Sequence, residues 1–160
     1  MFPSWLVIGI TATFIAVATL KLNTAEGMRW FNRQLRPRWL TFERAIPFIW
    51  ISIFICGAWS AYIAWEADPY SIKTWSLMLL YALTEVVIMA YNPVMAWFKS
   101  LKLGVWVGGM GFGLGLVLAI LVAKNSIWAT LLLVPYLLWS PIGTYVTWVM
   151  ANINHPQRRS

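Results

Sequence analysis

Five long apolar runs dominate this chain of 160 residues, and they constrain its fold more than any other feature. Each run has about the 20 residues that an α-helix needs to cross a bilayer. Because the runs are continuous, whereas a membrane β-strand alternates apolar and polar residues, they predict helices rather than a barrel. We therefore expect an all-α integral membrane protein, a single domain over residues 1–160 that forms a five-transmembrane-helix bundle. The predicted spans are 4–20, 45–65, 75–98, 103–123 and 127–151.

Composition excludes a soluble domain, and the distribution of charge predicts an orientation. Charged residues make up 11% of the chain, against about 25% in soluble proteins. An odd number of spans places the two ends on opposite sides, and the side richer in Lys and Arg faces the cytoplasm. Only Lys73 and Lys124 belong to the other side, so we expect an external amino terminus, a cytoplasmic loop over 21–44 and a cytoplasmic carboxyl tail. The basic residues of the cytoplasmic side are Lys21, Arg29, Arg33, Arg36, Arg38, Arg44, Lys99, Lys102, Arg158 and Arg159.

The net charge of +7 predicts contact with the lipid bilayer rather than with nucleic acid. The basic side chains flank the ends of the apolar runs, where anionic lipid headgroups supply the counter-charge. The connections between the later runs are short, which predicts that consecutive helices are antiparallel neighbours.

The segment 21–44 is the longest polar stretch, yet it is rich in aromatic residues. Asn23 or Thr24 is expected to cap a short helix with Met28, Phe31 and Leu35 on its apolar face, and Pro37 to end it. A segment this aromatic is not a disordered linker, so we expect it to fold back onto the bundle. Two interpretations stay open, an aromatic belt at the membrane interface and a lid over a cavity.

Glu85 is the only acidic residue in the interior of a predicted span. A carboxylate at bilayer depth costs about 2.5 kcal/mol or more, so Glu85 is expected to be protonated, paired or directed into a polar interior. It is interpreted either as a proton-accepting or ligand-anchoring group, or as a neutral acid hydrogen-bonded to a facing helix. Cys56 is the single cysteine, and neither a metal-ligand spacing nor a nucleophile with a base occurs. The sequence thus predicts no enzyme, no metal site and no obligatory cofactor.

Glycines concentrate in the fourth run, which holds six of the ten in the chain. Several are four residues apart, so the helix has bare faces against which another backbone can pack closely. That neighbour is either in the same bundle or in a second copy of the chain. The six are Gly104, Gly108, Gly109, Gly111, Gly113 and Gly115.

Twelve tryptophans require two explanations. Those near the ends of runs are typical of the membrane–water interface. Deeper indoles serve either packing or stacking against a planar ring. In the fifth run, Tyr136, Trp139, Ser140 and Gly143 share one helical face, which is suited to lining a flat aromatic pocket. The deeper tryptophans are Trp50, Trp59, Trp106, Trp139 and Trp148.

Motifs along nearly the whole chain point to one family. They are Glu26-Gly-Met-Arg-Trp30 and Leu35-Arg-Pro-Arg-Trp39 in the loop, Trp50, Gly57, Tyr62 and Trp65 in the second run, Tyr81 and Pro93 in the third, and Pro135-Tyr-Leu-Leu-Trp139 through Asn154 in the fifth. With these the chain resembles the translocator protein family, also called tryptophan-rich sensory proteins or peripheral-type benzodiazepine receptors. It looks like a divergent bacterial member of the kind expected in cyanobacteria. The pattern departs from the family's at Thr41, Phe42, Ile88, Tyr91 and Thr147.

The resemblance implies a five-helix bundle, usually a homodimer, in the inner membrane of a bacterium, or in a thylakoid if the source is photosynthetic. It implies a receptor or sensor whose cavity, open toward the first loop, takes porphyrins, haem-like tetrapyrroles or other flat apolar ligands for transport, sequestration or stress regulation. From charge alone, Arg36 and Arg38 are expected to meet tetrapyrrole propionates at the rim. The pocket residues carried over are Trp39, Trp50, Phe54, Tyr91, Pro93, Trp139 and Gly143.

Three alternatives remain beside the receptor hypothesis. One is light- or oxidation-dependent porphyrin degradation through Trp50 or Trp139. Another is a structural subunit of a larger membrane complex, which suits the glycine-rich fourth run. The third is a proton-coupled transporter that uses Glu85.

Overall fold

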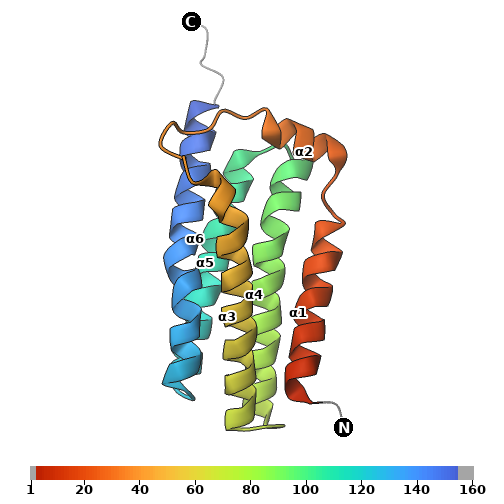
Figure 1. Ribbon diagram of the computed structural model, residues 1–160, viewed down its shortest axis with the longest axis vertical. Coiled ribbons are helices and arrows are strands. Elements are labelled where there is room, and N and C mark those ends of the chain that lie inside the picture. Colours follow the sequence, from red (N-terminus) through yellow and green to blue (C-terminus); the bar gives the residue numbers. More distant parts are fainter. Residues whose placement is uncertain (1–2, 155–160) are drawn as a thin grey trace, which may run out of the picture.

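The described part of the chain, residues 3–154 of a computed structural model, is helical (Figure 1). Five long helices stand side by side, and the short helix α2 lies across the end at which α1 finishes. The elements are α1 (Ser4–Leu20), α2 (Ala25–Asn32), the 3-10 turn η1 (Glu43–Ala45), α3 (Ile46–Ala67), α4 (Ile72–Trp97), α5 (Leu101–Ala123) and α6 (Ile127–Ile153).

Four of the described helices, α3 to α6, are each long and apolar enough to cross a membrane. The 17-residue α1 joins them as a fifth only when α1 and α2 are counted together as one segment, bent by 79°. The prediction of an all-helical membrane protein is therefore confirmed, with four or five candidate spans among six α-helices.

Hydroxyl side chains start α2 and the three helices that follow short turns, α4, α5 and α6. The side chain of Thr24 accepts a hydrogen bond from the backbone N–H of Gly27 at the start of α2. Ser71, Ser100 and Ser126 do the same at the starts of α4, α5 and α6. Each cap satisfies a backbone donor that has no partner within its helix, which is why the chain turns sharply and still begins a new helix at once.

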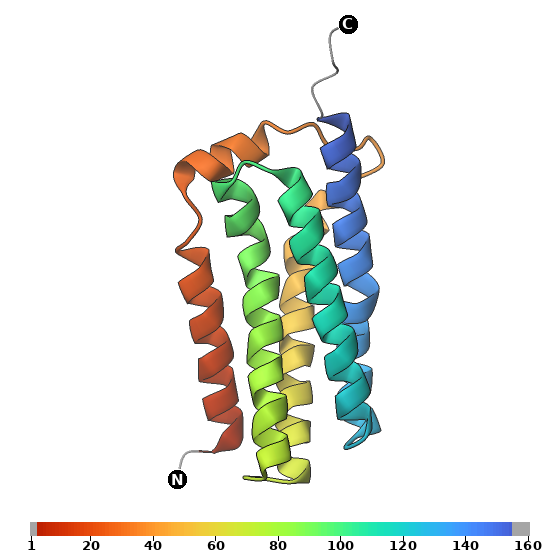
Figure 2. The same ribbon diagram turned by 180° about the vertical axis from the view of Figure 1, so that it is seen from behind.

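Helix packing does not follow chain order throughout. Helices α4, α5 and α6 pack consecutively, and α3 packs more extensively against α6 than against α4, although a short turn joins it to α4. Helix α1 packs against α4 and α3, and Figure 2 shows it on the far side of α4 from α5 and α6. The order around the bundle is therefore α1, α4, α5, α6 and α3.

The buried core is built mainly from α4, α5 and α6. One cluster lies at the end near the loop and includes Leu40, Met95 and Met150. The other lies toward the opposite end and includes Leu77, Leu118 and Val122. Only Thr19 of α1 is buried. The bundle thus has a solid side and a side where α1 and α3 pack less closely, and that second side contains the cavity described below.

The glycines of α5 divide into two groups by their surroundings. A Cβ added at Gly104, Gly108, Gly111 or Gly115 would approach side chains of α4 or α6. Those four positions therefore let α5 come close to its neighbours in the same chain. Gly109 and Gly113 would bring an added Cβ near nothing.

Candidate functional site

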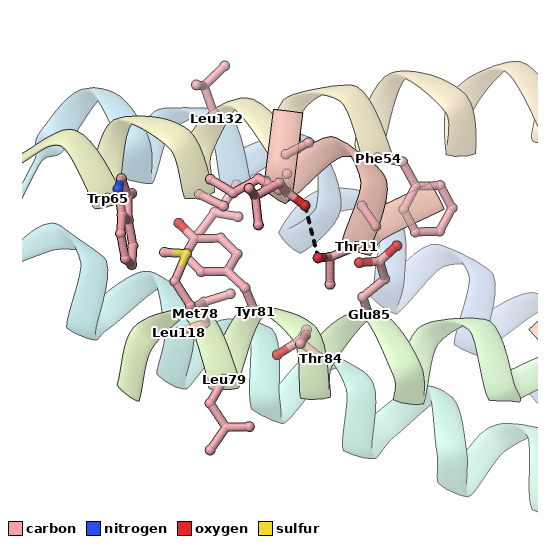
Figure 3. Close-up of a pocket in the computed structure, with 18 of the residues that line it drawn as sticks. Thr11, Phe54, Trp65, Met78, Leu79, Tyr81, Thr84, Glu85, Leu118 and Leu132 are labelled. Atoms are coloured by element: carbon pink, nitrogen blue, oxygen red, sulfur yellow. Dashed lines mark hydrogen bonds between the residues drawn. The ribbon is translucent and has the colours of Figure 1, made fainter. Parts of the chain in front are cut away.

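A cavity of about 600 Å³ lies between α1, α3 and α4 (Figure 3). It is lined by the first half of α1, the middle and second half of α3 and the first two-thirds of α4, with Leu118 of α5 and three residues of α6 completing the wall. These segments belong to the half of the bundle away from α2, so the cavity lies opposite the side toward which the resemblance implied an opening.

Small residues on one face of α3 create the space. Gly57, Ala58 and Ala61 line the cavity at helical spacing, and an added Cβ at Gly57 would meet no atom within 4 Å. Ala12 of α1 and Ala82 of α4 also line it. Because these side chains are short, three helices can surround a volume that Leu or Phe side chains would otherwise fill.

Aromatic side chains enclose the end of the cavity that is far from α2. The ring of Trp65 meets that of Trp75 edge to face at a centroid distance of 5.0 Å and that of Tyr70 at 5.3 Å. All three residues line the cavity. Nearby, the hydroxyl of Ser4 donates a hydrogen bond of 2.5 Å to the carboxylate of Glu66, which ties the start of α1 to the end of α3.

Glu85 lines the cavity near the middle of the bundle. Figure 3 shows its side chain reaching from α4 toward Thr11 of α1 and Phe54 of α3. It is half-buried, and within residues 3–154 no hydrogen bond or ion pair to its carboxyl group is found. The carboxyl group is thus the one acidic function among the described residues of a mostly apolar wall.

Hydroxyl groups on the wall already use their protons within the protein. The Ser60 hydroxyl, just behind the wall, donates to the carbonyl of Ala129 at 2.7 Å, so the Tyr81 hydroxyl must donate the 2.6 Å bond that joins it to Ser60. Thr11 donates to the carbonyl of Val7 at 2.9 Å. Thr84 similarly donates to the carbonyl of Leu80 at 2.7 Å. The oxygens of Tyr81, Thr11 and Thr84 keep lone pairs with which to accept further bonds.

The pocket residues taken from the resemblance separate into groups, and only Phe54 lines the cavity. Trp50 stacks on Phe54 one turn along α3, with ring centroids 5.8 Å apart. On the loop side, Trp39 stacks on Tyr145 at 6.0 Å. The ring of Phe42 meets Trp139 edge to face at 6.3 Å.

The remaining residues of that predicted set lie among the packed helices. Gly143 is half-buried, and an added Cβ there would lie 3.9 Å from the indole nitrogen of Trp139. Pro93 is buried within α4. The Tyr91 hydroxyl is hydrogen-bonded to that of Thr147 on α6. These positions lie between α4, α5 and α6 or beneath the loop.

Arg36 is engaged within the loop. Its guanidinium group donates to the carboxylate of Glu43 at 3.2 Å and to the carbonyls of Phe31 and Gln34 at 2.8 and 2.7 Å. It also lies over the ring of Phe31, 4.7 Å from the centroid. Arg38 is exposed. Among the described residues, therefore, Arg36 organises the loop, and Arg38 keeps an exposed side chain at the same end of the bundle.

Comparison with known proteins decides the family. The model of the TspO/MBR family matches residues 5–153, nearly the whole chain. The chain belongs to the TspO/MBR family. It is 27% identical to the uncharacterized membrane protein YtaB of Bacillus subtilis over 158 residues, which is 92% of this chain and 97% of YtaB. It is 26% identical to the tryptophan-rich protein TspO of Bacillus cereus over 133 residues, which is 78% of this chain and 80% of that relative.

Sequence reasoning missed most of the cavity in this TspO/MBR protein, although a signal was present. Phe54, Gly57, Ala58, Ala61 and Trp65 follow one face of α3 at intervals of three or four residues. A face of small residues between two aromatic rings predicts either close helix contact or a void. Which of the two occurs depends on whether a facing helix supplies side chains that fill the space.

Proposed function

We propose that this TspO/MBR protein is a receptor or sensor of a bacterial inner membrane that binds flat apolar ligands, tetrapyrroles among them, inside its helix bundle. The observation that carries the proposal is the cavity of about 600 Å³ between α1, α3 and α4. Small-molecule sites typically have volumes of about 300–1,000 Å³ and mostly apolar walls. The tryptophan, tyrosine and phenylalanine rings around the cavity suit a planar guest.

We further propose five spans, with α1 as the first and α2 at the cytoplasmic surface. Basic residues support this orientation because eight of the described ones lie at the α2 end, in the segment between α1 and α3, in the turn after α4 or in the first turn of α5. Lys73 and Lys124 lie at the other end, while Arg158 and Arg159 fall outside the described residues. The positive-inside rule then makes the α2 end cytoplasmic and places the cavity in the outer half of the membrane.

The position of the cavity changes the expected contact with tetrapyrrole propionates. Arg36 and Arg38 belong to the loop at the other end of the bundle. Lys73 lies between Tyr70 and Trp75, both of which line the cavity, and its side chain is exposed. A tetrapyrrole held in this cavity would therefore direct its propionates toward the outer surface, near Lys73.

Filling the cavity tests the proposal directly. In Gly57→Leu the new side chain would enter open cavity space, so protoporphyrin should bind about tenfold more weakly or worse, a loss of roughly 1–3 kcal/mol. Gly9→Leu is the matched control, because Gly9 also has open space around it but does not line the cavity. Binding would be measured by quenching of tryptophan fluorescence in phosphatidylcholine nanodiscs. Unchanged affinity in Gly57→Leu would refute binding at this cavity.

Porphyrin degradation through Trp50 or Trp139 has less support than binding. Neither residue lines the cavity, and Trp139 lies beside Phe42 on the loop side. A porphyrin bound in the cavity would therefore contact Trp65 and Trp75 rather than Trp50 or Trp139.

A further inference from the structure

Around Glu85 the wall of the cavity presents more hydrogen-bond acceptors than donors. Glu85 contributes a carboxyl group with no partner in the described chain. Thr11, Thr84 and Tyr81 contribute hydroxyl oxygens whose protons are already donated elsewhere. Among the side chains of residues 3–154 that line the cavity, Tyr136 alone has a buried hydroxyl with no hydrogen-bond partner. A ligand that donates hydrogen bonds would find several acceptors around Glu85, whereas one that only accepts would find the Tyr136 hydroxyl and, at the far end, the indole N–H groups of Trp65 and Trp75.

The charges around the cavity favour the same class of ligand. None of the described residues that line it is Lys, Arg or His. An exposed carboxylate, Glu66, is tied to Ser4 at its outer end, and the exposed Lys73 lies at the same end outside the wall. The rings of Trp65 and Trp75 offer negatively polarised faces, which attract cations. An anionic ligand would meet no opposite charge in this wall.

Net charge in a low-dielectric site distinguishes an amine from other polar groups. A carboxyl group and an amine together carry no net charge, whichever of them holds the proton. The pair therefore avoids the cost of a lone buried charge and gains a hydrogen bond in either state. An alcohol forms a weaker bond with the same carboxyl group, and a carboxylate adds a second negative or acidic group to it.

We propose that the cavity selects flat apolar ligands that carry a basic amine, with the nitrogen held by Glu85 and the aromatic body lying along Gly57, Ala61 and Trp65. An ammonium group has three donors and no acceptor, which matches the wall of acceptors around Glu85. The inference rests on the proposed function only in that the ligand occupies the same cavity. It names a basic amine as the polar group of the ligand, whereas the polar groups of tetrapyrroles are propionates.

Three ligands with one aromatic body test this selectivity. Pyrenemethylamine, pyrenemethanol and pyrenecarboxylic acid differ only in the polar group, and energy transfer from tryptophan to pyrene reports their binding in phosphatidylcholine nanodiscs. The amine should bind about tenfold more tightly than the alcohol, as expected for a charged hydrogen bond in place of a neutral one, and the acid should bind most weakly. Each ligand is compared between protein variants. Its partition into lipid is the same in every such comparison and therefore cancels.

Two glutamine variants locate the effect. In Glu85→Gln, which keeps the shape of the side chain, the preference for amine over alcohol should fall to about twofold or less. Glu66→Gln, at the outer end of the cavity where the carboxylate is exposed and bonded to Ser4, should retain most of the preference. Glu85→Asp keeps the carboxyl group and should preserve part of the preference for the amine. That result would show that the loss in Glu85→Gln does not come from a folding defect. Survival of the full preference in Glu85→Gln, or its complete loss in Glu66→Gln, would overturn the proposal.

The same measurements separate failure of this inference from failure of the proposed function. If all three pyrenes bind equally and Gly57→Leu weakens all of them, the cavity is a binding site and the amine selectivity is wrong. If none of them binds and protoporphyrin binding is insensitive to Gly57→Leu, the binding function itself is wrong, and the amine inference fails with it.

Discussion

Leu35 and Asn154 are 119 residues apart in the chain and are joined by two hydrogen bonds. The backbone N–H of Leu35 donates to Oδ1 of Asn154 at 2.9 Å, and Nδ2 of Asn154 donates to the carbonyl of Leu35 at 3.0 Å. The same Nδ2 also donates to the carbonyl of Met150 at 2.9 Å, which fixes the side chain on α6. The side-chain amide of Asn154 thus pairs with both backbone groups of Leu35, as a neighbouring β-strand would.

Asn154→Ala should release the loop from α6. The change leaves the backbone groups of Leu35 without these partners, so we expect a loss of about 1–3 kcal/mol in the stability of the closed loop. Limited trypsin digestion at the neighbouring arginines, Arg36 and Arg38, should become several-fold faster. Asn152→Ala, two residues away on an exposed position, is the control and should digest like the unaltered protein. Equal digestion of both variants would show that the pairing does not hold the loop.

A second link joins α2 to the turn after α4 and depends on pH. The Lys99 ammonium group donates a hydrogen bond of 2.5 Å to the carboxylate of Glu26, and this bond with the charge of Lys99 lowers the pKa of Glu26 below its ordinary value of 4.5. Because the folded pKa is lower than the unfolded one, the contribution of the pair is present above pH 4.5 and is lost as the pH falls through the folded pKa.

The Glu26 pKa is directly measurable by NMR titration of its carboxyl carbon. It should lie below 4.5 in the unaltered protein and return toward 4.5 in Lys99→Met, which keeps the length of the side chain and removes its charge. Lys102→Met, three residues further along the chain, should leave it low. Since Glu26 and Lys99 are exposed, the effect on global stability should be small. A Glu26 pKa that stays low in Lys99→Met would assign the shift to another group.

The elements of this fold follow from the sequence because the bilayer imposes a length on each of them. The run predicted at 103–123 became α5, Leu101–Ala123, and the run at 127–151 became α6, Ile127–Ile153. The largest error at a start is in α4, which begins at Ile72 rather than at 75. Ser71 caps the helix there, so Lys73 and Thr74 are helical although they are not apolar.

The site was harder to predict because the faces of a membrane helix look alike in sequence. A soluble helix shows its buried face by an apolar stripe, whereas lipid makes the outward face apolar too. Trp50 and Phe54 are adjacent on α3, yet only Phe54 reaches the cavity. The consecutive helices α3 to α6 do pack against one another as predicted, but the more extensive packing of α3 against α6 could not be predicted from chain order. The way in which the helices pack against one another determines where the cavity lies.

Two glycines of α5 should respond oppositely to the same substitution. At Gly115 an added Cβ would overlap the ring of Tyr136, so Gly115→Ala should cost about 1–3 kcal/mol. At Gly113 the new methyl group meets nothing, so Gly113→Ala should be neutral or stabilising by up to about 1 kcal/mol. Unfolding in mixed micelles measures both. The double variant Gly115→Ala with Tyr136→Leu should recover part of the loss, and no recovery would mean that the ring is not the source of the clash.

Ser60 should matter more to stability than Tyr81, although the two share a hydrogen bond. Ser60 is fully buried and joins α3 both to the Tyr81 hydroxyl at 2.6 Å and to the carbonyl of Ala129 at 2.7 Å. Ser60→Ala leaves the Tyr81 proton without an acceptor in an apolar setting, which should cost about 1–3 kcal/mol. Tyr81→Phe leaves Ser60 still bonded to Ala129, so about 1 kcal/mol is expected.

Unfolding in mixed micelles would measure the stability of Ser60→Ala, of Tyr81→Phe and of the double variant. Because Tyr81→Phe removes the donor that Ser60→Ala strands, the double variant should be no less stable than Ser60→Ala alone. Tyr81 lines the cavity, and its hydroxyl oxygen can accept a hydrogen bond from an amine. Tyr81→Phe should therefore also weaken the binding of pyrenemethylamine more than the binding of pyrenemethanol. A larger loss in Tyr81→Phe than in Ser60→Ala would mean that the Tyr81 hydroxyl stabilises the bundle by more than its bond to Ser60.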